Sequence, residues 1–240
     1  MNSFDSRGQS EIYRQQDRAA ANAGFMSRVY FWMMLGLMLS GIVAYEVAGS
    51  KEFLTVLLGS RALWFGLILV QFGAVIAISA FVSRMSAVMT TAVYLGYAIL
   101  SGVTFSVILL AFTAESISQA FFITSFAFIG LSLFGYLTKR DLGPVGSFCM
   151  TGLFGVIGLI LAGLIFPSIM TDAVQMTINV CGIIIFSGLT AYDTQKIKNF
   201  NSAVQGSEMA RKQVIVGALT LYLDFINLFL SILRLTGGRR

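Results

Sequence analysis

Seven long apolar stretches, separated by short polar segments, dominate the sequence after residue 27. They cover residues 28–49, 62–82, 87–113, 119–138, 147–169, 171–192 and 214–235. A helix needs about 20 mostly apolar residues to cross the hydrocarbon core of a bilayer, and a spanning helix satisfies its own backbone hydrogen bonds. The pattern therefore predicts an all-α, polytopic membrane protein with a seven-helix membrane domain over residues 28–235.

Two polar segments flank this domain. Residues 1–27 hold three arginines and three acids, and they lack the apolar core and the small-residue cleavage site of a signal peptide. We expect them to form a short, largely disordered cytoplasmic tail. Residues 236–240 form a short basic tail.

The composition supports the bilayer as the main partner. Hydrophobic residues make up 57% of the chain and charged residues only 11%, whereas a soluble domain carries about 25% charged residues. The net charge is +5, but the basic residues form short clusters between apolar stretches and no basic stripe or RNA-binding motif. We therefore expect no nucleic-acid partner.

The distribution of Lys and Arg predicts the orientation. With the N-terminus inside, the cytoplasmic side holds eleven of these residues and the outside holds five, which follows the positive-inside rule. Seven crossings then place the C-terminus outside. The basic C-terminal tail favours the opposite side, which a re-entrant last segment would allow.

The residue types exclude several chemistries. The chain has no histidine, and its two cysteines, Cys149 and Cys181, lie inside apolar stretches. Zinc sites, haem sites and Ser-His or Cys-His catalysis therefore lose their usual ligand or base. We interpret the cysteines as small packed side chains and expect no resident cofactor.

Asp224 is an acid in the middle of an apolar stretch, LTLYLDFINLFL. It lies about ten residues into that stretch, which corresponds to a depth of about 15 Å, and Asn227 follows on the same helical face. Ionisable residues at such depth are expensive and commonly functional. A lone carboxylate there holds a proton at neutral pH unless it has a partner. The structural alternative is a neutral acid that only hydrogen-bonds neighbouring helices.

Asp193 closes the sixth stretch, in SGLTAYDTQKIK. It lies about one turn inside the cytoplasmic surface if the helix continues through the following lysines. An interfacial acid balanced by those lysines is the simpler alternative. Arg84, between the second and third stretches, is expected on the same side and is a candidate counter-ion if those helices are neighbours.

Together these groups predict a pH-sensitive site. Acids on consecutive helices can meet in space, and two carboxylates that share a site exchange protons as a unit. An added arginine gives Asp193 and Asp224 alternative partners, which is the basis of a latch on a polar path for cations. Their oxygens also suit Ca²⁺ as a transported ion.

The same residues carry a resemblance to a known family. The segments SGLTAYDTQKIK (187–198) and GALTLYLDFINLFLSILRL (217–235) resemble the Bax inhibitor-1/YccA family, also called the transmembrane Bax-inhibitor-motif family. The run TKRDLG (138–143) and the closing GGRR are similar to its bacterial inner-membrane members. The resemblance covers essentially the whole chain.

The resemblance implies a seven-helix bundle with the last helix near its centre, and a pH-sensitive calcium leak with a di-aspartyl sensor. By match to the motifs, the sensor is Asp193 and Asp224, and Arg84 is the arginine that latches the first acid. Tyr192 and Asn227 are the supporting polar residues. Some relatives carry an acid in the second span, where this chain has Gln71. The missing charge puts strong calcium conduction in doubt.

Two other function classes remain beside the cation leak. Bacterial members of the family are linked to the membrane-bound AAA protease FtsH, so one alternative is a non-transporting interaction protein that modulates this protease or a stress response. The other is an intramembrane aspartyl protease. That class needs a Gly-x-Gly-Asp helix start and a Pro-Ala-Leu element, whereas Asp224 follows Leu-Tyr-Leu and the only prolines are Pro144 and Pro167. We therefore expect no enzymatic activity.

Overall fold

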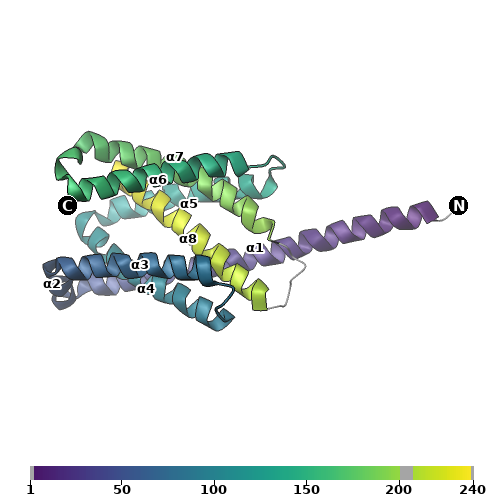
Figure 1. Cartoon of the computed structure of the whole chain (residues 1–240), viewed down its shortest axis with the longest axis horizontal. Helices are drawn as coiled ribbons and strands as arrows, with labels where there is room; N and C mark the ends of the chain where they lie inside the picture. The colour runs from purple at the N-terminus through teal and green to yellow at the C-terminus, as the bar shows by residue number, and fades with distance from the viewer. Residues whose placement is uncertain (1–2, 201–207, 239–240) are drawn as a thin grey trace.

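The computed structural model describes residues 3–200 and 208–238, and within them it confirms an all-α bundle with seven helices long and apolar enough to cross a membrane. Figure 1 shows the elements in order: α1 (Ser3–Gly49), α2 (Lys51–Gly59), α3 (Arg61–Phe81), α4 (Ala87–Ala111), α5 (Ala114–Leu137), α6 (Gly143–Ile165), the 3₁₀ turn η1 (Pro167–Ile169), α7 (Asp172–Lys198) and α8 (Glu208–Thr236). Each predicted stretch corresponds to one long helix, although the stretch predicted over 147–169 extends past the end of α6 into η1. The short helix α2 was not predicted.

The N-terminal segment differs from its prediction. Residues expected to form a disordered tail are helical from Ser3 onward, and α1 extends beyond the bundle (Figure 1). The physical reason is that residues 3–27 contain no proline and are rich in the good helix formers Ala, Gln and Arg. The packed domain also begins before residue 28, because Phe25 and Met26 are already buried.

Helix α8 is the central helix of the bundle, as the family resemblance implied. It packs against α1, α4, α5 and α7, and it runs obliquely between them (Figure 1). In the most apolar 18-residue segment of α8, 56% of the residues are buried. In the corresponding segments of the other spanning helices, at most 28% are buried. Asp224, on this helix, is therefore largely removed from lipid and water.

Helix α8 also crosses the whole bundle. The N–H of Gly238 donates to Ser116 Oγ over 3.0 Å, and the N–H of Thr113 donates to the carbonyl of Gly238 over 3.3 Å. Both partners lie at the α4–α5 connection, which is at the far end from the start of α8 (Figure 1). The start of α1 and the end of α8 therefore lie at opposite ends of the bundle, and α8 does not turn back within it.

The connections divide the bundle into two ends. We call the end that holds the starts of α4, α6 and α8 and the C-terminal ends of α5 and α7 the basic end, because Arg84, Lys139 and Lys198 lie there. Two interactions hold its elements together. The Leu142 N–H donates to Gln195 Oε1 over 2.9 Å, and the Ala87 N–H donates to Glu208 Oε1 over 3.1 Å.

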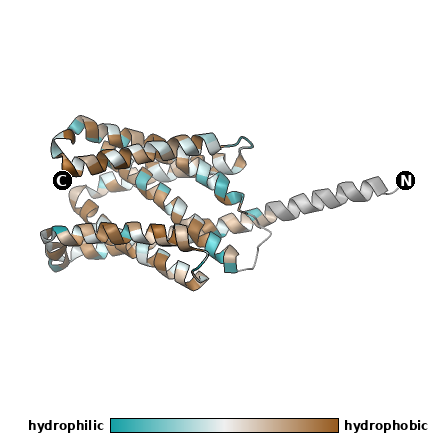
Figure 2. Ribbon diagram, viewed as in Figure 1, coloured by the Kyte–Doolittle hydropathy of each residue, from teal (hydrophilic) through white to brown (hydrophobic). Residues whose placement is uncertain are grey.

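The outer surface is apolar over most of its area (Figure 2). Large side chains such as Val88 and Phe126 are about four-fifths exposed, at 80% and 77%. Helix α3 is the most peripheral span, and Ile78 is its one buried residue in the described chain. A surface of this kind is stable in hydrocarbon and not in water, so the described bundle is that of a membrane protein.

Small residues allow close helix crossings in this lipid-facing bundle. A side chain at Gly135 on α5 would collide with the backbone carbonyl of Ala191 on α7. Beside this contact, Thr194 Oγ1 donates to Ser132 Oγ over 3.3 Å. Close backbone approach with an added interhelical hydrogen bond is a common way to hold helices together in lipid.

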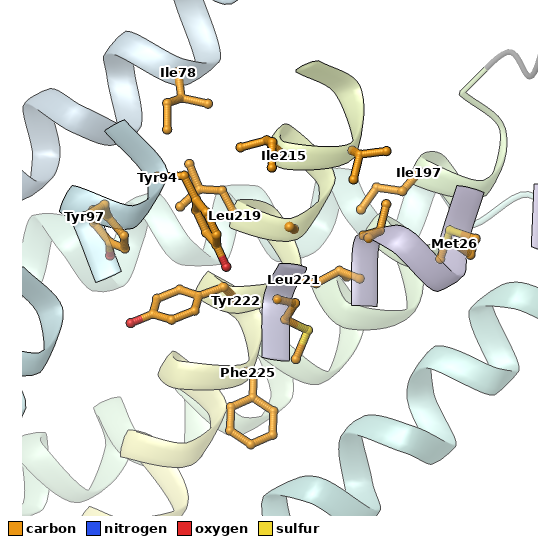
Figure 3. Packing of buried hydrophobic residues seen from close by; sticks show 14 of the residues in the cluster. Met26, Ile78, Tyr94, Tyr97, Ile197, Ile215, Leu219, Leu221, Tyr222 and Phe225 are labelled. Carbon is orange, nitrogen blue, oxygen red and sulfur yellow. The ribbon is translucent and has the colours of Figure 1, made fainter. Parts of the chain in front are cut away.

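A second seam joins α1, α4 and α8 through hydroxyl groups. Ser40 Oγ donates to the carbonyl of Ala98 over 2.8 Å and lies 2.8 Å from the hydroxyl of Tyr222. A serine has one hydroxyl proton, so Tyr222 is the donor to Ser40. The Tyr222 ring makes edge-to-face contacts with Tyr94 and Tyr97, and Figure 3 shows the three rings gathered together. Tyr222 thereby fixes one face of the central helix.

We predict that two glycines on α5 respond with opposite signs to the same substitution. Gly135→Ala should destabilise the bundle by about 1–3 kcal/mol, because the new methyl group has no room against α7. Gly130→Ala should be neutral or stabilising by up to about 1 kcal/mol, because Gly130 has free space around it and alanine favours a helix. Thermal unfolding midpoints of the detergent-solubilised proteins measure both effects. Equal shifts of the same sign would contradict the described α5–α7 seam.

We also predict that Tyr222→Phe lowers the free energy of unfolding by about 0.5–1.5 kcal/mol, because the substitution removes the hydrogen bond to Ser40 and keeps the ring. Tyr45→Phe is the matched control, since Tyr45 is 74% exposed. The same unfolding assay applies, and a loss as large in the control as in Tyr222→Phe would be inconsistent with the hydroxyl seam.

Candidate functional site

The first predicted site residue, Asp224, is buried in the middle of α8. Its side chain is 4% exposed, and it lies 16 residues after Glu208 and 12 before Thr236, the two ends of the helix. Its Oδ2 atom has no hydrogen-bond partner, and it is the one such buried side-chain atom among the described residues. A buried polar atom without a partner costs about 1–3 kcal/mol, so the fold retains Asp224 at an energetic cost.

The second predicted residue, Asp193, lies on α7 near the basic end. It is half-buried and precedes Lys198, the last residue of the helix, by five positions. The ammonium group of Lys196 attracts its carboxylate. The predicted helix continuation through both lysines is confirmed, so Asp193 is about one turn from the end of its span.

The register between α7 and α8 brings the two acids to similar heights. A side chain at Gly182 on α7 would meet Ser231 on α8. Asp193 lies 11 residues from Gly182, about 16 Å along the axis, and Asp224 lies 7 residues from Ser231, about 10 Å. Both displacements run toward the basic end, because α7 and α8 are antiparallel. The acids are therefore offset by about one helical turn, with Asp193 closer to the basic end.

A second contact gives the same register. Near the basic end, Ile197 of α7 packs against Gly217 of α8. Asp193 is about 6 Å from that level and Asp224 is about 10 Å from it. The two carboxyl groups interact electrostatically in the structure. The structure thus brings together the two acids that the sequence singled out.

The two polar faces of α8 point in different directions. Tyr222 and Asp224 are two residues apart, which turns their side chains about 200° away from each other around the helix. Tyr222 faces α1 and α4, whereas Asp224 interacts electrostatically with Asp193 on α7. The acid therefore lies on the side of α8 that packs against α7.

The two supporting residues have partners other than the acids. Asn227 Nδ2 donates over 2.8 Å to the carbonyl of Leu223 in its own helix. The ring of Tyr192 covers Gly146 on α6, and the Lys196 ammonium lies 5.6 Å from the ring centroid. Tyr192 thus packs α7 onto α6.

Arg84 is not brought to the acid pair. Its side chain is exposed in the turn between α3 and α4. In residues 3–200 and 208–238, no ion pair joins it to Asp193, and the salt bridge found there links Lys212 to Glu208 over 3.7 Å. The proposed Arg84 latch therefore stays a prediction about another state of the protein.

The sequence reasoning missed the ionic contact at the start of α8. Lys212 is only 7% exposed, and its partner Glu208 also accepts the hydrogen bond from the Ala87 N–H. The contact ties α8 to the start of α4, next to the turn that carries Arg84. The sequence signal for this contact was an acid, Glu208, followed four positions later by a base, Lys212, a spacing at which two side chains meet on a helix.

The donor set of the site is small. In the part of the chain that the structure describes, no three Asp, Glu or Cys side chains gather in one place. Gln71 is bonded elsewhere: its side-chain Nε2 donates to Thr104 Oγ1 on α4 over 2.8 Å. The pair supplies two carboxylates, fewer ligands than the six to eight oxygens of a resident calcium site.

Comparison with known proteins places these features in a family. Residues 22–240 match the family model described as "Inhibitor of apoptosis-promoting Bax1". The chain is 42% identical over 218 residues to the inner membrane protein YbhL of Escherichia coli, which covers 90% of this chain and 92% of YbhL. It is 38% identical to an uncharacterized protein of Borreliella burgdorferi, over 90% of this chain and 92% of that protein. It is also 38% identical to an uncharacterized protein of Caulobacter vibrioides over the full length of both. The chain therefore belongs to the Bax inhibitor-1 family of membrane proteins.

Proposed function

We propose that this protein is a pH-sensitive leak pathway for cations, with calcium as the candidate ion, in a bacterial inner membrane. The observation that carries the proposal is the buried, unpartnered carboxyl group of Asp224 on the central helix, which interacts with Asp193 one turn nearer the basic end. An intramembrane acid with these properties is a functional group by default.

The proposed mechanism depends on the protonation of the pair. When Asp224 is neutral, it packs between α7 and α8 without an uncompensated charge. When both acids are ionised, their repulsion favours separation of α7 from α8, and their oxygens attract a partly hydrated cation. Proton uptake therefore couples the packing of α8 to the polarity of the path beside it.

The proposal also requires basic side chains that can pair with Asp193. Lys196 already attracts Asp193 in the structure. Arg84 lies at the same end, in a turn that adjoins the Glu208–Lys212 contact. A shift of that turn would allow Arg84 to pair with Asp193 in a second state, as the family resemblance implies.

The proposed location and orientation rest on two arguments. The relative YbhL is an inner membrane protein, and the chain has seven apolar spans in its described part. The excess of Lys and Arg at the basic end favours that end, with the N-terminus, in the cytoplasm. A calcium leak would then run from outside the cell toward Asp224 and Asp193.

We predict that Asp224→Asn flattens the pH dependence of calcium flux. The protein is reconstituted in liposomes that contain a calcium-sensitive dye. Calcium uptake is then measured at several pH values between about pH 5 and 8, because coupled carboxyl groups exchange protons over a broad pH range. The calcium uptake rate of the wild type should change several-fold across this pH range. For a single titrating group the rate changes by at most about tenfold per pH unit. The variant should show nearly the same rate at each pH, because its amide cannot ionise.

Asp172→Asn is the matched control. Asp172 is an exposed acid in the first turn of α7, at the other end of the same helix. Its pH profile should follow wild type. A wild-type pH profile in Asp224→Asn would remove Asp224 from the sensor, and absence of flux in the wild-type protein would remove the leak itself.

The alternative proposal is a non-transporting protein that modulates the membrane AAA protease FtsH or a stress response. The helical extension of α1 beyond the bundle favours it, because a projecting helix offers a surface for a partner (Figure 1). If this alternative holds, FtsH should co-purify equally with wild type and Asp224→Asn, and neither protein should conduct calcium. Flux without co-purification would reject the alternative in favour of the leak.

A further inference from the structure

A lateral groove separates α1 from α5 on the surface of the bundle. Its volume is about 750 Å³. The α1 wall runs from Ala23 to Met38 and the α5 wall from Phe121 to Tyr136, so each wall is about 22 Å long. Phe225 of α8 contributes to the floor. The groove therefore reaches from the basic end past the middle of the bundle and touches the central helix.

The walls of the groove are apolar and open toward the surroundings of the bundle. Met34, Met38 and Leu133 line it, and each is more than half exposed. In a membrane-spanning bundle such a surface lies in hydrocarbon. The volume of about 750 Å³ is in the range of pockets for small molecules. A long, open, apolar groove of this size fits an acyl chain.

A fixed positive charge lies at the basic end of the groove. Lys198 Nζ donates to the carbonyl of Tyr136 over 2.6 Å and lies 4.9 Å from the centre of the Tyr136 ring, and Tyr136 lines the groove. An ammonium group has three N–H donors, so this hydrogen bond leaves two for a ligand. Lys139 follows three residues after Tyr136. The nearby Asp141 carboxylate accepts a hydrogen bond from the Gly143 N–H over 2.9 Å at the start of α6.

We infer that this groove binds one anionic phospholipid from the leaflet at the basic end. Its acyl chain lies along the apolar walls against Phe128 and Phe225, and its phosphate lies at Lys198, with Lys139 beside it. Basic pockets between spanning helices are a recurrent site for acidic lipid headgroups. The inference does not depend on ion conduction, so its test is independent of the proposed function.

The site has a direct connection to the central helix. Phe225 immediately follows Asp224 in the chain and is 4% exposed within the protein. Its ring, labelled in Figure 3, makes edge-to-face contacts with Phe121 and Phe128 of α5, at centroid distances of 5.7 and 5.5 Å. A lipid in the groove therefore packs on the aromatic cluster that holds the helix carrying the buried acid.

Native mass spectrometry of the full-length, delipidated protein tests this inference. The protein is incubated with equal amounts of phosphatidylglycerol and phosphatidylcholine of the same chain length. We expect one retained lipid per chain, with about a fivefold preference for phosphatidylglycerol, the effect of about one basic residue near a lipid headgroup. Ser125→Trp, which fills the groove, should lose the lipid. Lys198→Gln should retain a lipid and lose the preference.

Two variants with the same types of substitution serve as controls. Gly130→Trp adds the same ring on α5 at a position with open space and outside the groove, and Lys51→Gln removes a charge at the start of α2, at the other end of the bundle. Both should bind as wild type. The inference is overturned if wild type shows no headgroup preference, or if Ser125→Trp, folded by its unfolding midpoint, keeps the lipid. A wild-type dimer that Ser125→Trp abolishes, without retained lipid, would instead assign the groove to a second copy of the chain.

Discussion

The central helix of this bundle is the most buried of the spans and still carries polar groups, and the rest of the structure follows from how those groups are partnered. Lipid and an apolar protein interior offer no hydrogen bonds, so each buried polar atom needs a partner within the bundle. On one face of α8 this requirement is met, because Tyr222 donates to Ser40 and packs against two further tyrosines. On the opposite face it is not met, because Asp224 Oδ2 has no hydrogen-bond partner. One face is built for stability, and the other retains an unsatisfied group.

The unsatisfied face of α8 is also the one that interacts electrostatically with an acid on another helix. Asp193 lies about one turn away along α7, on a helix that small residues allow to approach closely. A proton on either acid therefore changes the interaction between two helices and not only the charge of one side chain. The aromatic contacts of Phe225 place the same segment of α8 next to the lateral groove. The proposed proton site and the proposed lipid site thus involve adjacent residues of one helix.

The sequence predicted the spans and the acid pair, because runs of about 20 apolar residues and an acid within such a run are local signals. The central position of α8 was not evident from its own pattern and came from the family resemblance. Other features depend on which helices meet. The position of Arg84 is set by the α3–α4 turn, and the bond from Tyr222 to Ser40 joins residues 182 positions apart. The groove forms because α1 and α5 do not close on each other, which no local pattern encodes.

The central claim is that Asp193 and Asp224 exchange protons as a pair, and infrared spectroscopy tests it most directly. The carboxyl stretching band of Asp224 is identified as the band that Asp224→Asn removes, and it is followed through a pH titration in wild type and in Asp193→Asn. The account predicts that the titration midpoint of this band moves by about one pH unit or more when Asp193 can no longer ionise. A band that titrates at the same pH in both proteins would contradict it.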